Sequence, residues 1–158
     1  MRRRHVLSLV GGAVLFPGAV LAQGCGLPSG AEAALADVTN LTNDLRRRSG
    51  LSPLDLSPAL FAAAQEQACH MAATGRMSHS GAGGSGVGDR ASAAGYRWRF
   101  VAENVAAGHP DAQAVVAGWQ ASPGHRDNML SRQAVDIGLG VAAGGGRLYW
   151  AMVLGAPL

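Results

Sequence analysis

Apolar residues recur along this chain at spacings that predict amphipathic helices. One pattern follows Ser29, a residue type that caps helix starts, and ends before Gly50 with a last turn of three arginines. A second pattern follows Ser57, takes Pro58 as its first helical residue, and ends at Gly75. Both helices must therefore pack one face against a core.

The second half of the chain adds a shorter helix and then two strands. Asp111 caps the predicted helix, whose apolar positions end at Trp119. The strand patterns cover 135–141 and 148–154, and the glycine-rich segment 142–147 between them predicts a hairpin. Helices followed by paired strands predict the α+β class, with helices packed on a small antiparallel sheet.

Residues 78–88 are mostly glycine, serine and alanine, a composition that predicts a mobile loop. Segment 81–86 matches the glycine pattern of dinucleotide-binding proteins, but no strand pattern precedes it and no helix pattern follows directly, so we exclude nucleotide binding. His79 stands at the entrance of this loop. A second histidine, His125, follows the helix-breaking pair Pro123-Gly124, so both rings come from breaks in secondary structure.

The first residues carry the features of an export signal. Three arginines precede a mostly apolar run over 6–21, and Ala22 is a small residue of the kind that signal peptidases accept. We therefore divide the chain into an export signal over 1–22, a linker over 23–30 and a single domain over 31–158. The paired arginines leave both the general secretory route and the twin-arginine route open.

Removal of this signal changes the charge of the chain. It takes three of the thirteen basic residues and none of the ten acidic ones, so the mature chain has ten of each and no net charge. Because no basic run is interleaved with aromatic residues, we exclude nucleic acid as a partner. No later segment is a candidate membrane span, which predicts a secreted or periplasmic protein.

Cys25 and Cys69 are the two cysteines of the chain. In an exported protein they predict one disulfide, which ties the N-terminal segment to the second helix. The alternative is a lipid anchor on Cys25, because that residue lies just past the apolar run. The residues before Cys25 match the lipidation pattern poorly, so the disulfide is the favoured interpretation.

Glu103 is the clearest anomaly in the pattern, because its carboxylate lies inside the apolar run 100–106. Such a carboxylate needs an ion pair, hydrogen bonds or a metal. It is either a structural group bonded to amides or an arginine, or a member of a cleft that also contains His79 and His125. Two histidines and a glutamate form the ligand set of a catalytic zinc, although here they come from separated segments. A metal-free, hydrogen-bonded cluster of the same groups is an alternative.

Several motifs occur in order along residues 36–156. They include Met77-Ser78-His79-Ser80, the stretch 102–108, the stretch 119–130 and Ile137-Gly138-Leu139-Gly140, and it is their order that makes the match specific. Together they resemble the CAP superfamily, the cysteine-rich secretory, antigen five and pathogenesis-related proteins, and in particular its compact bacterial branch. The resemblance implies an α-β-α sandwich and a cleft lined by histidines and glutamates, which in some members holds a divalent metal such as zinc.

The resemblance places His79, Glu103 and His125 on three of the four cleft positions. The fourth, a glutamate in many eukaryotic members, is Ser122 here, which removes one candidate ligand or acid–base group. Asp127 is an accessory candidate for that role. No residue of the cleft is assigned as catalytic.

These observations predict an exported binding module whose cleft holds a divalent metal and whose partner is an extracellular ligand, a lipid or a protein. The alternative is a metal-assisted hydrolase that acts on extracellular peptides, esters or cell-wall polymers. The sequence leaves open whether the protein is an enzyme, because the cleft groups occur without a convincing nucleophile.

Overall fold

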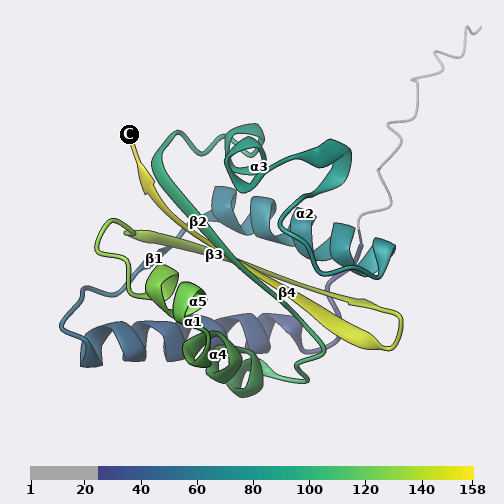
Figure 1. The fold of residues 1–158 in the computed structure, drawn as a ribbon, viewed down its shortest axis with the longest axis horizontal. Coiled ribbons are helices and arrows are strands. Elements are labelled where there is room, and N and C mark those ends of the chain that lie inside the picture. The colour runs from purple at the N-terminus through teal and green to yellow at the C-terminus, as the bar shows by residue number, and fades with distance from the viewer. Residues whose placement is uncertain (1–24) are drawn as a thin grey trace, which may run out of the picture.

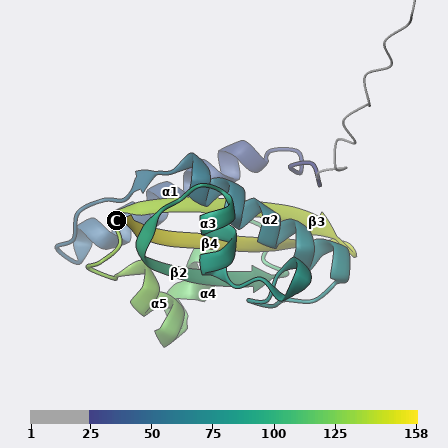
Figure 2. The same cartoon turned by 90° about the horizontal axis from the view of Figure 1, so that it is seen from above.

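The fold is a three-layer α-β-α sandwich (Figure 1, Figure 2). The structure is a computed structural model that describes residues 25–158, so the predicted export signal lies outside the described residues. One face of the central sheet is covered by α1 (Ala31–Arg48), α4 (Ala112–Ala121) and α5 (Pro123–Met129). The other face is covered by α2 (Pro58–Thr74) and α3 (Val87–Ala93). The α+β class and the sandwich are therefore confirmed.

The sheet has four strands in the order β1-β3-β4-β2. They are β1 (Asp55–Leu56), β2 (Trp98–Ala107), β3 (Asp136–Gly144) and β4 (Arg147–Pro157). Strands β3 and β4 form the predicted glycine hairpin, and both run past their predicted ends. Strand β2 pairs antiparallel with β4 at one edge, whereas the short β1 pairs parallel with β3 at the other. The sheet is therefore antiparallel except for β1.

Local interactions set most of the predicted helix boundaries. The hydroxyl of Ser57 and the carboxylate of Asp111 each accept a hydrogen bond from the backbone amide three residues later, at 3.3 and 2.8 Å. Gly75 ends α2 with a φ of 68°, in the left-handed region that favours glycine. The expected cap of α1 at Ser29 is wrong. Gly30 occupies that position, and no side-chain hydrogen bond closes the start of the helix.

Alternating residues of the central strands build two separate cores, because successive side chains of a strand point to opposite faces. On β4, Trp150 and Met152 pack with α1 and α4. Tyr149 and Ala151 pack with α2 and α3. The sheet is therefore buried on both faces, which explains why its strands read as nearly continuous apolar runs.

Helix α2 lies directly on the backbone of β3, because the strand residues that face it are small. Gly138 and Gly140 point toward this helix, while Leu139 between them points into the opposite core. A Cβ atom on Gly138 would lie 2.0 Å from the carbonyl carbon of Leu60, and one on Gly140 would lie 2.5 Å from that of Ala64. Glycine is therefore required for the close approach of helix and sheet.

Cys25 and Cys69 form the predicted disulfide, which links the N-terminal segment to α2 over a separation of 44 residues. The sulfur of Cys25 is thereby engaged, and the lipid-anchor alternative has no support in the structure. This bond holds the beginning of the described chain against the domain.

We expect Gly140→Ala to destabilise the protein by at least about 2 kcal/mol, because the added methyl group must push α2 away from the sheet. Denaturant unfolding followed by circular dichroism measures the change. Gly124→Ala is the matched control, since a Cβ at that exposed helical position meets nothing within 4 Å. Equal unfolding midpoints for the two variants would show that the contact between α2 and β3 does not need glycine.

Candidate functional site

Three segments bring His79, Glu103 and Arg90 into direct contact. Glu103 lies on β2, Arg90 on α3, and His79 in the loop between α2 and α3. Nδ1 of His79 lies 2.9 Å from Oε2 of Glu103, and Nη2 of Arg90 donates to Oε1 at 2.5 Å. The Arg90 and Glu103 side chains are 1% and 2% exposed, whereas that of His79 is 62% exposed. The carboxylate is thus a buried anion between a buried guanidinium and an accessible imidazole.

The glycine-rich loop that carries His79 is held by side chains from both flanking helices. Nη1 of Arg90 donates to the carbonyl of Ser85 at 2.7 Å and to that of His79 at 3.4 Å. Nε2 of Gln67, fully buried on α2, donates to the carbonyls on either side of His79, at 2.5 and 3.4 Å. Composition alone predicts a mobile loop here, but its backbone is bonded to two buried polar side chains.

His125 is presented by α5, a short helix that begins directly after α4. Ser122 separates the two helices with extended backbone, and Pro123 is the first residue of α5. The predicted break between the two helices is confirmed, but it lies at Ser122, and Pro123, Gly124 and His125 form the first turn of α5. Two asparagines attach α5 to β2: Nδ2 of Asn104 donates to the carbonyl of His125 at 3.0 Å, and Nδ2 of Asn128 donates to Oδ1 of Asn104 at 2.9 Å.

The three predicted cleft residues lie along one edge of the sheet. Strand β2 is an edge strand, and its consecutive residues reach opposite faces. Glu103 points toward α3 on one face, and Asn104 points toward α5 on the other. His79 and His125 therefore approach this edge from opposite layers of the sandwich, and of the two only His79 is bonded to Glu103.

The two accessory candidates do not complete a ligand set. The hydroxyl of Ser122 makes no capping hydrogen bond at the start of α5, and Asp127 is exposed on that helix. Between residues 25 and 158, no three or more histidine, cysteine, aspartate or glutamate side chains are grouped so that they could hold a metal ion. A full set of four protein ligands is therefore absent from this part of the chain.

Burial lowers the pKa of His125 from its ordinary value of 6.5, and the charge of nearby His79 lowers it further. The neutral form of the ring is therefore favoured at neutral pH. A neutral imidazole is the form that binds metals and accepts protons.

The donor groups of His79, Glu103 and His125 would suit a metal held by the two imidazoles better than a metal held by the carboxylate. Glu103 already uses one oxygen for Arg90 and the other for His79. When Nδ1 of His79 donates to this carboxylate, Nε2 is left free as a ligand. A carboxylate that orients a metal-binding histidine in this way is common around metal sites. His79 and His125 would hold the metal, and Glu103 would orient His79.

Comparison with known proteins assigns the chain to a family. Residues 39–154 match the model of the cysteine-rich secretory protein family, CAP, so the chain belongs to this family. It is 30% identical over 118 residues to the YkwD protein of Bacillus subtilis, a match that covers 75% of this chain and 46% of that protein. The chain therefore spans less than half the length of this relative.

Solved structures share the fold. An extracellular protein containing an SCP domain from Bacillus anthracis superposes with a TM-score of 0.70 at 27% identity, covering 78% of this chain and 40% of that one. An outer surface protein of Borrelia burgdorferi superposes with a TM-score of 0.75 at 18% identity, covering 80% of this chain and 95% of that one. At that identity the second likeness shows the fold alone.

Sequence reasoning found the two histidines and the glutamate but missed the side chains that hold them. Gln67 carried a usable signal, because it falls among the apolar positions of α2, and a buried amide there needs a partner. Arg90 lies in a short helix whose pattern is too brief to show a buried face. The need of Glu103 for a partner was predicted, with backbone amides, an arginine or a metal left open, and the structure shows that Arg90 is one such partner.

We expect Arg90→Met to destabilise the protein by about 3–5 kcal/mol, because it leaves the buried Glu103 carboxylate without a counter-charge. Denaturant unfolding measures the loss. Arg126→Met removes an exposed arginine from α5 and is the control. The double variant Arg90→Met/Glu103→Leu should regain much of the stability. If the Arg90 and Arg126 variants unfold at the same denaturant concentration, the ion pair contributes nothing to stability.

We expect His125 to titrate below about 6.5 in an NMR pH titration. In His79→Gln its pKa should rise but stay below the ordinary value, because burial is the larger cause. Since the unfolded state then binds more protons, stability should fall as pH drops below about 6.5 and level off below the folded pKa. His125→Gln should remove this loss. A titration of His125 that is unchanged by His79→Gln would disprove the coupling between the two rings.

Proposed function

We propose that this protein is an exported binding module whose cleft holds a divalent metal through the imidazoles of His79 and His125. The observation that carries the proposal is the contact between Nδ1 of His79 and the buried carboxylate of Glu103. This contact fixes the orientation of an exposed ring and leaves its other nitrogen free.

The electrostatics of the cleft support a metal with few protein ligands. The charge of Glu103 is balanced by Arg90, and His125 is neutral around pH 7 because its pKa is lowered. Zinc accepts neutral imidazole nitrogens and keeps open positions when the protein supplies fewer than four ligands. The open positions would be filled by water or by a group of the extracellular ligand, while Ser122 is smaller than the glutamate that occupies this position in many eukaryotic members.

The hydrolase alternative has less support. A glutamate that activates water needs an oxygen free to accept the proton, and both oxygens of Glu103 are engaged. A bound metal would supply a polarised water, but with His79 and His125 as its ligands, neither imidazole would be left as a general base. Binding rather than turnover is therefore the function that the arrangement favours.

The proposed location is outside the cytoplasm, in the secreted or periplasmic space. The leader pattern over 1–22 and the disulfide between Cys25 and Cys69 support this location, since disulfides persist in oxidising compartments. The Bacillus anthracis protein with the same fold is an extracellular protein. Within the described part of the chain, no helix has the length and hydrophobicity to cross a membrane.

We expect zinc titrated into the purified protein to give saturable heat in calorimetry, and we expect His79→Ala and His125→Ala each to abolish it, because each supplies one of two protein ligands. His70→Ala is the matched control, since it removes a half-buried histidine from α2 outside the cleft. Thermal melts confirm that each variant is folded. Equal heats for all four proteins would eliminate the proposed site.

A further inference from the structure

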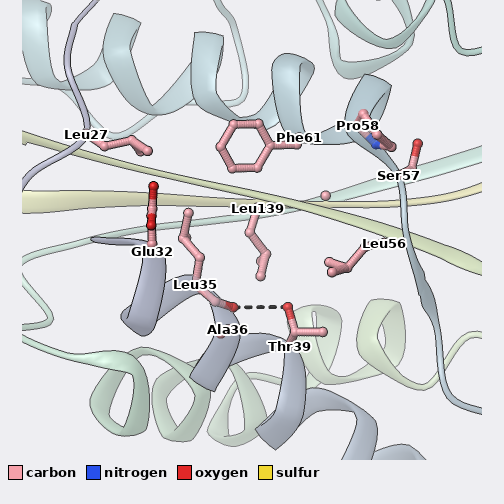
Figure 3. Close-up of a pocket in the computed structure, with 11 residues that line it drawn as sticks. Leu27, Glu32, Leu35, Ala36, Thr39, Leu56, Ser57, Pro58, Phe61 and Leu139 are labelled. Atoms are coloured by element: carbon pink, nitrogen blue, oxygen red, sulfur yellow. Dashed lines mark hydrogen bonds between the residues drawn. The ribbon is translucent and has the colours of Figure 1, made fainter. Parts of the chain in front are cut away.

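Helix α1 turns a row of polar residues toward the core. Thr39, Thr42 and Arg46 are all buried, and their spacing of three and four residues places them on one face of the helix. The hydroxyl of Thr39 donates to the carbonyl of Leu35 in the same helix, at 3.0 Å, in the wall of an apolar groove between α1 and the start of α2 (Figure 3). Other residues that line the groove are Leu27, Leu56, Phe61 and Leu139. Arg46 lies beyond this groove, and its guanidinium bonds to no residue of α1.

The guanidinium of Arg46 is surrounded by backbone carbonyls. Its Nη1 donates to the carbonyls of Met129 and Ser131, both at 2.9 Å. Its Nε donates to the carbonyl of Ser52 at 2.8 Å, and its Nη2 donates to that of Ala134 at 3.3 Å. Arg46 is only 2% exposed, and within residues 25–158 no carboxylate lies at salt-bridge distance from it. Carbonyl dipoles therefore replace the water around a cation that stays protonated in proteins.

These bonds fix the end of α5. Met129 is the last residue of that helix, where carbonyls lack partners within the helix and a cation is favoured. The first turn of α5 is held from the other side, because Nδ2 of Asn104 on β2 donates to the carbonyl of His125 at 3.0 Å. The short helix is therefore bonded to β2 at its start and to α1 at its end.

We propose that Arg46 is a positioning residue of the histidine cleft, which sets the place of His125 relative to His79 by holding the end of α5. Arg46 acts through backbone carbonyls, and none of its hydrogen bonds goes to either histidine or to Glu103. The planar fork of a guanidinium is required, because its donors point in several directions from three nitrogens, whereas a lysine has one nitrogen. The effect on metal binding rests on the proposed function, but the placement of His125 does not.

The first experiment compares Arg46→Lys with the matched control Arg48→Lys, which makes the same change at an exposed position in the same turn of α1. Thermal melts establish that both variants are folded. We expect the ring signals of His125 in NMR spectra of the metal-free protein to shift in Arg46→Lys only. The ring signals of His70 and His79 should stay in place, because neither residue is attached to α5. A side chain that serves stability alone would lower the melting temperature and leave the His125 signals of the folded protein unchanged.

The second experiment measures zinc binding by calorimetry. Arg46→Lys should bind zinc about tenfold more weakly than the unchanged protein, as is typical when a residue that orients a ligand is altered, and Arg48→Lys should bind equally well. Arg46→Ala should lose more affinity, because no donor reaches the carbonyls. Guanidinium chloride, far below the concentration that unfolds the protein, should restore zinc binding and the His125 signals of Arg46→Ala, whereas sodium chloride at the same concentration should not.

The outcomes separate this inference from the proposed function. Unchanged His125 signals in folded Arg46→Lys overturn the positioning role, and so does a rescue of Arg46→Ala by both salts alike. If the unchanged protein binds zinc and Arg46→Lys binds it equally well, Arg46 does not act on the cleft. If the unchanged protein binds no zinc, the proposed function fails, and the NMR comparison by itself decides whether Arg46 places His125.

Discussion

A buried ion pair between Arg90 and Glu103 is the interaction on which the candidate site depends. Both side chains are almost fully excluded from water, so each charge is tolerated only because the other is present. The guanidinium uses further donors on the backbone of the loop that carries His79, and the carboxylate uses its second oxygen on the imidazole. One electrostatic constraint therefore positions helix α3, strand β2 and the loop relative to one another.

Helix α2 connects this polar edge of the sheet to the apolar edge on the other side. Its first turn supplies Phe61 to the groove, its middle supplies Gln67 to the loop of His79, and Cys69 joins it to the N-terminal segment. Helix α2 can lie this close to the backbone of β3 only because Gly140 and the nearby glycines of that strand have no side chains. The close packing of α2 on β3 therefore helps to position residues at both edges of the sheet.

The fold was largely predictable from local patterns. Capping by Ser57 and Asp111 and the glycine hairpin between the last two strands were all visible in the sequence and are confirmed. The start of α1 was placed one residue early, at Ser29, because a serine is the usual cap and Gly30 takes the position without a side chain. Strand β1 was missed, since two residues carry no periodic pattern. Strand β2 was missed as well, because it was interpreted only as the apolar run 100–106.

By itself, the sequence determined the three longest helices, the hairpin, the cysteine pair, the two candidate histidines and the need of Glu103 for a partner. These are properties of residues and their near neighbours. Only the tertiary structure decided that this partner is Arg90, that Asn104 binds the carbonyl of His125, and that an apolar groove opens beside Leu27. The physical reason is that each of these contacts joins segments brought together by strand order and helix packing, which no short stretch of sequence encodes.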